Sequence, residues 1–109
     1  MNQELKTAAR SFITANASYQ AAFNELRRRI TSIWGLVDPV PASPRFTEWD
    51  HDMGIIENEL EIDEKFRAMN GLCDDLRIVL FASGVRIGDD LGSARDWCAR
   101  NMDAIGGEA

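Results

Sequence analysis

Apolar residues recur every seven positions through the first third of the chain. One row contains Leu5, Phe12, Tyr19, Leu26 and Ile33, and a second row, offset by four residues, contains Ala9, Asn16, Phe23, Ile30 and Val37. Two interleaved rows with this spacing form one seam along a helix, as they do in coiled coils. The pattern predicts a single helix over residues 2–34, with Gly35 as its stop signal.

Three positions of this seam, Asn16, Phe23 and Ile30, are candidate contacts in a self-associated form. A polar amide at a seam position can set the register or the oligomeric state of paired helices, at a cost in stability. The alternative is that Asn16 lies where the seam is shallow, because Ala15 and Ala17 flank it.

The pattern after a Pro-rich turn at 35–43 predicts a second helix over residues 44–83, with a possible kink near 70–71 at Asn70-Gly71. At about 100° per residue, its apolar residues form two stripes on different sides of the helix. The first stripe contains Phe46, Trp49, Met53, Ile56 and Leu60; the second contains Ile55, Ile62, Phe66, Met69, Cys73, Leu76 and Leu80.

A third, shorter helix is predicted over residues 89–105. We therefore expect one all-α domain, residues 1–109, with three to four helices: a long antiparallel hairpin and a shorter C-terminal helix. The last helix is too short to cover the end of the hairpin near the turn, so the stripe from Phe46 to Leu60 is expected to be uncovered. Exposed apolar patches of this kind mark interfaces. The alternative is that shorter, kinked helices fold into one compact bundle.

Charge is distributed unevenly along the chain. The formal net charge of −6 combines +3 over residues 1–46 with −9 over residues 47–109. Eight carboxylates between positions 48 and 64 form two rows beside the first stripe: Glu48, Asp52, Glu59 and Asp63 in one, and Asp50, Glu57, Glu61 and Glu64 in the other. This acidity disfavours direct binding to nucleic acid, which requires cations. Three interpretations of these rows stay open. They form a solvated helix face, they form the rim of a docking surface, or they imitate the phosphates of a nucleic-acid duplex.

Candidate chemistry is sparse. Glu48, His51 and Asp52 share one side of a helix, but a di-iron bundle needs a second Glu-x-x-His pair, and the chain has one histidine. Cys73 and Cys98 are expected to be buried free thiols without a base nearby. We therefore predict no enzyme, no metal and no cofactor. The sequence lacks a signal peptide and an apolar span, which predicts a cytoplasmic protein without a membrane partner.

The function that this pattern predicts is protein binding. The first stripe would dock on a partner through Trp49, Met53, Ile56 and Leu60, with Asp50, Glu57, Glu61 and Glu64 as flanking carboxylates. The specific form expected is an inhibitor that occupies the basic groove of a nucleic-acid-binding complex. Size and charge alone suggest the comparison with phage-encoded inhibitors such as anti-CRISPR proteins. The alternative is a self-associating structural module, in which the seam and the stripe of the second helix build a homodimer, or an adaptor.

Overall fold

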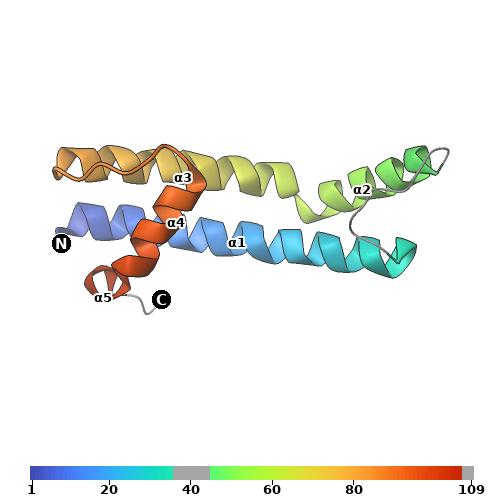
Figure 1. Ribbon diagram of the computed structural model, residues 1–109, viewed down its shortest axis with the longest axis horizontal. Helices are drawn as coiled ribbons and strands as arrows, with labels where there is room; N and C mark the ends of the chain where they lie inside the picture. Colours follow the sequence, from blue (N-terminus) through green and yellow to red (C-terminus); the bar gives the residue numbers. More distant parts are fainter. Residues whose placement is uncertain (36–44, 107–109) are drawn as a thin grey trace. The chain divides into compact units, whose positions relative to one another are not determined.

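The chain folds into α-helices. The computed structural model describes residues 1–35 and 45–106, and within these ranges it contains no strand. The helices are α1 (Gln3–Trp34), α2 (Phe46–Leu60), α3 (Ile62–Ala82), α4 (Leu91–Arg100) and α5 (Met102–Ile105) (Figure 1). The predicted all-α fold is confirmed. The predicted turn at 35–43 lies, apart from Gly35, outside the described residues.

The helices divide between two compact units. Unit 1 contains Met1–Ala17 and Phe66–Ala109, and unit 2 contains Ser18–Lys65. Helix α1 therefore contributes its first half to unit 1 and its second half to unit 2. The single domain that the sequence predicts stays a prediction.

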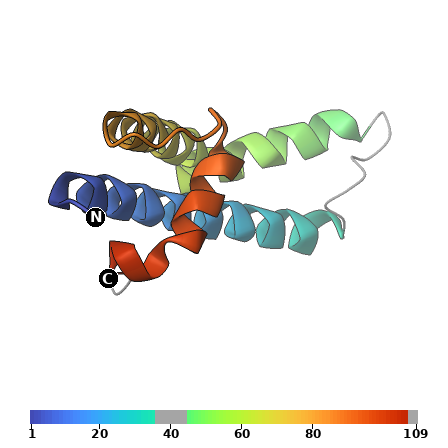
Figure 2. The same ribbon diagram turned by 60° about the vertical axis from the view of Figure 1, so that its left-hand side comes forward.

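Unit 2 is an antiparallel pair of helices. The second half of α1 and the whole of α2 lie side by side in every view (Figures 1 and 2). Leu26 and Ile30 of α1 and Ile56 of α2 are buried at the centre of this pair. The seam of α1 therefore packs against α2 within unit 2.

Unit 1 places the first half of α1 beside α3, with α4 and α5 packed on them. Arg95 joins α4 to α1, since its Nε donates a hydrogen bond of 2.7 Å to Oδ1 of Asn16. Near the C-terminal end, Nε of Arg10 donates a hydrogen bond of 3.1 Å to the carbonyl oxygen of Ile105. The buried apolar side chains of the unit are Leu5, Ala9, Phe12, Met69, Cys73, Leu76, Leu80, Ala94, Trp97, Cys98 and Ile105.

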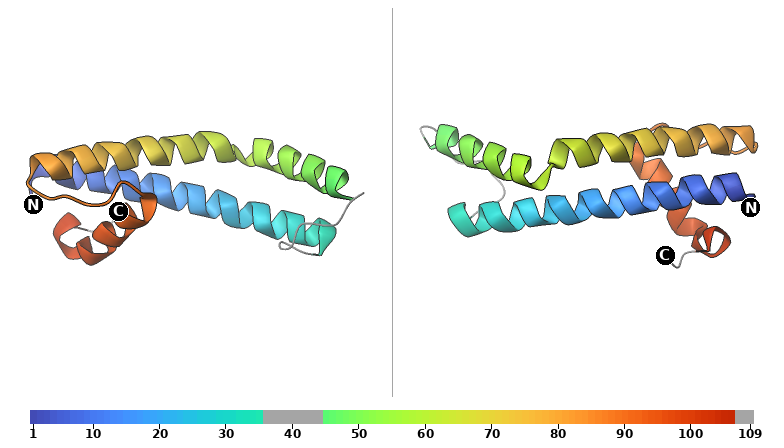
Figure 3. Two further views of the ribbon diagram at one scale, coloured as in Figure 1. Left: turned by 45° about the horizontal axis from the view of Figure 1, so that its top comes forward. Right: turned by 180° about the vertical axis from the view of Figure 1, so that it is seen from behind.

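The predicted second helix is broken at Glu61 (Figure 3). This residue has φ 56 and ψ 41, which is left-handed backbone, and its N–H donates to the carbonyl of Asn58 at 3.2 Å. Helix α3 starts at Ile62 and continues through Asn70 and Gly71, so the kink predicted at 70–71 is wrong. The reason is packing: in a continuous helix, residues two apart point about 200° apart. The break allows Leu60 to pack into the unit 2 core and Ile62 to be buried as well.

The predicted third helix is also two helices. Asn101, with φ −119 and ψ 19, separates α4 from α5. Its side-chain Nδ2 donates a hydrogen bond of 2.8 Å to the carbonyl oxygen of Trp97, one turn earlier. Asparagine side chains compete in this way with the backbone bonds of a helix. The change of direction buries Ile105 completely.

Candidate functional site

The apolar stripe that the sequence assigns to docking is the core of unit 2. Ile56 is only 6% exposed and belongs to one cluster with Leu26 and Ile30. Four partly buried side chains pack against this cluster: Trp34, Trp49, Met53 and Leu60. The prediction that the stripe is uncovered is therefore wrong for Trp49, Met53, Ile56 and Leu60, whereas Phe46, at the start of the stripe, is exposed. The second half of α1 itself provides the cover, because its own apolar row faces α2.

The seam residues do not lie together on a free surface either. Ile30 is buried in the unit 2 core, and Asn16 accepts the hydrogen bond from Arg95 within unit 1. Only Phe23 is exposed, with its ring 6.0 Å from that of Tyr19. A homodimer seam through Asn16, Phe23 and Ile30 would have to displace contacts that the folded chain already makes.

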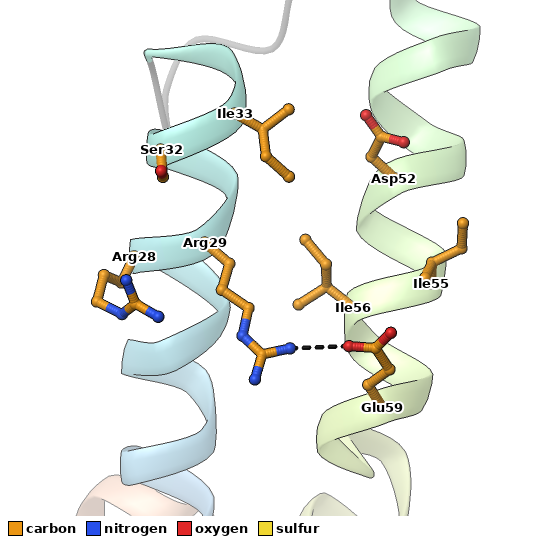
Figure 4. Close-up of a pocket in the computed structure, with 8 residues that line it drawn as sticks. All are labelled: Arg28, Arg29, Ser32, Ile33, Asp52, Ile55, Ile56 and Glu59. Atoms are coloured by element: carbon orange, nitrogen blue, oxygen red, sulfur yellow. Dashed lines mark hydrogen bonds and ion pairs between the residues drawn. The ribbon is translucent and has the colours of Figure 1, made fainter.

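Two carboxylates of α2 are bonded to side chains of α1. Oδ2 of Asp52 accepts a hydrogen bond of 2.9 Å from Nε1 of Trp34. Oε2 of Glu59 lies 2.8 Å from Nη1 of Arg29, an ion pair that connects the two helices (Figure 4). Both residues belong to one of the two predicted acidic rows, so that row is in part a set of helix-to-helix contacts.

Two arginines of α1, Arg28 and Arg29, pair with a carboxylate on the same helix. Glu25 pairs with Arg28 at 2.6 Å and with Arg29 at 2.9 Å. Hydrogen bonds from Arg28 and then from Arg29 lower the pKa of Glu25 to about 2. The cations of Arg28 and Arg29 are therefore already paired within the chain.

The remaining carboxylates near α2 are without cations. Six of them make no ion pair with any residue in the described ranges: Glu48, Asp50, Glu57, Glu61, Asp63 and Glu64. Partial burial, followed by the charges of Asp63 and Asp50, raises the pKa of Glu57. Asp50 and Glu57 are seven residues apart on α2 and so lie on the same side of that helix, while Asp63 lies near enough to Glu57 for its charge to act on the pKa of that carboxyl. We call these three residues the acidic cluster.

The acidic cluster contains Asp63, which the sequence did not place in the same row as Asp50 and Glu57. The sequence places Asp63 in the row of Glu48, Asp52 and Glu59, because a continuous helix would put it about 240° away from Glu57. The left-handed backbone at Glu61 changes the phase between α2 and α3. It brings Asp63 near enough to Glu57 to raise the pKa of that carboxyl.

An open hollow of about 390 Å³ lies between α1 and α2 of unit 2 (Figure 4). It is lined by Arg28, Arg29, Ser32, Ile33, Asp52, Ile55, Ile56 and Glu59. Its charged groups are engaged with one another, with Glu25 or with Trp34. The hollow is a surface between two packed helices, and its polar lining serves to join them.

The three residues that share one helix side and were weighed as metal ligands, Glu48, His51 and Asp52, do not form a centre in the structure. Within residues 1–35 and 45–106, no three or more His, Cys, Asp or Glu side chains are grouped so that they could hold a metal ion. His51 is exposed, and Asp52, the third candidate ligand beside it, is bonded to Trp34.

Both cysteines are free and buried, as predicted. Burial, followed by the charge of Cys73, raises the pKa of Cys98 to about 11. Burial also raises the pKa of Cys73. Both thiols are therefore protonated at neutral pH and poor nucleophiles.

Sequence reasoning missed a second exposed surface, at the end of α3. Ile78 and Phe81 are the most exposed large apolar side chains of the described part of the chain. The available signal was the run Ile78-Val79-Leu80-Phe81, since four successive helical residues cannot all face one side. Leu80 is buried, so its neighbours had to point elsewhere.

Within the ranges that the structure describes, no helix has the length and apolar character needed to cross a bilayer. No family model, no curated protein and no solved structure matches this chain. The function is therefore argued from the surfaces of the chain itself.

Proposed function

We propose that this chain functions by binding a protein partner through its acidic cluster. The observation that carries the proposal is that Asp50 and Glu57 lie on one side of α2, with Asp63 near Glu57, and that none of the three makes an ion pair with a residue in the described ranges. The partner would present lysine or arginine side chains at the matching positions. Binding would block or recruit that partner.

The physical argument rests on repulsion between like charges. Partial burial is the largest cause of the raised pKa of Glu57, and the charges of Asp63 and then of Asp50 raise it further, because neighbouring carboxylates disfavour one another's ionised form. This repulsion destabilises the unbound chain, and a cationic partner surface would relieve it. Complementary charge also accelerates encounter and selects against wrong partners.

Docking on a cationic patch has more support than imitation of both strands of a duplex. Imitation would use the two predicted acidic rows together. Asp52 and Glu59, from one of them, are already bonded to Trp34 and Arg29 of α1. The sequence also predicted a more specific function, an inhibitor in the basic groove of a nucleic-acid-binding complex. That function requires only the acidic cluster, so it remains part of the proposal.

The test is a triple charge reversal with a matched control. Asp50→Lys, Glu57→Lys and Asp63→Lys together should weaken binding to the partner captured from the native host by about 100-fold or more, by isothermal titration calorimetry. The control, Asp75→Lys, Asp89→Lys and Asp103→Lys, produces the same formal charge from exposed acids of unit 1.

The control variant should bind within about threefold of wild type, since its changes lie outside the cluster. The cluster variant should stay close to wild type in its resistance to urea, because three lysines repel one another much as the three carboxylates do. Equal binding by the cluster variant and wild type would contradict the proposal. For the groove-blocking form, the bound chain should also displace a labelled oligonucleotide from the captured partner.

A further inference from the structure

The end of α3 carries an apolar surface in unit 1 that nothing in the described chain covers. Ile78 is 66% exposed, Phe81 64% and Val85 36%. They line a hollow of about 380 Å³ together with Ile87, Arg77 and Arg86. We call it the α3 hollow. Its lining contains two arginines and no carboxylate.

This surface is held in place by the end of the helix. The N–H of Val85 donates to the carbonyl of Leu80 at 2.8 Å, and the N–H of Gly84 donates to the carbonyl of Phe81 at 3.0 Å. Gly84 has φ 84. These bonds form a Schellman motif, which fixes the residue after the glycine against the last turn of the helix. The exposed side chains therefore belong to an ordered helix end.

The arginines give the α3 hollow a positive character. Arg86 lies over the Phe81 ring, 5.4 Å from its centroid, and makes no ion pair with a residue of the described part. Nη2 of Arg77 is bonded to Asp74 at 2.8 Å, while its Nε is buried without an acceptor. A fitting occupant combines an apolar side chain with a nearby carboxylate.

Helix α2 of the same chain has this chemistry. It carries five carboxylates and no lysine or arginine. Phe46, at its start, is 46% exposed. Asp50 lies one turn further on the same side of the helix, and it makes no ion pair with a described residue. An exposed aromatic ring followed by a free carboxylate complements an apolar hollow edged by Arg86.

We infer that the α3 hollow receives α2 of a second copy of this chain, with Phe46 entering between Ile78, Phe81 and Val85 while Asp50 pairs with Arg86. The contact joins two different surfaces, so each copy offers one hollow and one α2. Such contacts are head-to-tail and extend into rings or longer assemblies. The inference goes beyond the proposed function, and it makes partner binding and self-association compete, because both use Asp50.

Sedimentation velocity on the full chain, from micromolar to millimolar concentration, tests this inference. Wild type should show a mass that rises with concentration past the dimer. Phe81→Asp, the hollow variant, and Phe46→Ser with Asp50→Arg, the helix variant, should each associate at least about tenfold more weakly. Ile33→Asp, a change at an equally exposed apolar residue of unit 2, is the matched control and should associate like wild type.

The decisive measurement mixes the two variants. A hollow variant still has an intact α2, and a helix variant still has an intact hollow, so an equimolar mixture should form a one-to-one dimer and nothing larger. Far-ultraviolet circular dichroism checks that each variant is folded, and Phe81→Ser serves as a second hollow variant without an added charge.

Three results would overturn the inference. One is a wild-type chain that stays monomeric at every concentration, which would leave a different protein as the occupant. Another is a hollow variant that associates like wild type. The third is a mixture that stays monomeric, since the intact α2 of the hollow variant should still enter the intact hollow of the helix variant. Partner binding by Phe81→Asp should be unchanged, which separates this test from that of the proposed function.

Discussion

The left-handed backbone at Glu61 can be tested by the stability of a glycine variant. The sign of the change in the free energy of unfolding distinguishes a helix break at Glu61 from a continuous helix over 44–83. Glu61 has φ 56 and ψ 41. A side chain with a Cβ in this region costs about 1–2 kcal/mol relative to right-handed helical backbone, whereas glycine adopts it freely. We therefore expect Glu61→Gly to stabilise the folded chain.

The magnitude follows from two opposing contributions. Relief of the left-handed strain is worth about 1–2 kcal/mol. The greater freedom of glycine in the unfolded chain offsets about 0.4–1 kcal/mol of this gain. The net change spans about 0–1.6 kcal/mol, with a central value of about 0.8 kcal/mol of stabilisation. In a continuous helix over 44–83, the same substitution would place glycine in a helix interior and cost about 1 kcal/mol.

The assay is urea unfolding followed by far-ultraviolet circular dichroism. Glu61→Gln is the control, because it removes the charge but keeps the Cβ atom, and its free energy of unfolding should stay within about 0.5 kcal/mol of wild type. A Glu61→Gly chain that is less stable than both wild type and Glu61→Gln would refute the left-handed assignment and support a continuous helix.

Three further predictions concern single residues. Gly71→Ala should raise the free energy of unfolding in urea by about 1 kcal/mol, because an added Cβ meets nothing within 4 Å in α3; a loss of stability would instead indicate a kink there. Ile56→Ala should cost about 2–4 kcal/mol in the same titration, while Ile55→Ala on the exposed side should change little, and equal effects would contradict the assignment of Ile56 to the core. The Cys98 thiol, with its pKa raised from 9.0 to about 11, should react with a disulfide reagent about 100-fold more slowly at pH 8 than a free cysteine. A labelling rate equal to that of free cysteine would contradict the burial of Cys98. The thiol of the unfolded chain ionises at lower pH than the folded one, so the stability that Cys98 contributes is complete below pH 9 and is lost between pH 9 and about 11.

Periodicity in the sequence predicted the first helix closely because that pattern is local. The helix expected over 2–34 is observed as Gln3–Trp34. Row positions such as Leu5, Phe12 and Leu26 are buried, but Ile33 of the same row is exposed. Spacing shows which residues share a side of a helix, and burial then depends on what packs against that side.

The acidic residues illustrate the same division at the candidate site. Their number and their concentration between positions 48 and 64 are properties of the sequence. The contacts of Asp52 and Glu59 with α1, and the approach of Asp63 to Glu57, depend on the packing of unit 2 and on the break at Glu61. Neither could be derived from a helical projection that assumes one continuous helix.

The sequence by itself determined the all-α class, the length of the first helix, the apolar stripes and the acidity of the second third of the chain. All of these arise from interactions between residues a few positions apart. The tertiary structure decided where the second helix breaks, which stripe is core and which apolar residues remain exposed. Those outcomes depend on contacts between residues distant in sequence: α1 could cover the stripe from Trp49 to Leu60 only because its own seam faces it, and Ile78 and Phe81 are exposed because Leu80 and Leu76 are buried on the other side of the same helix.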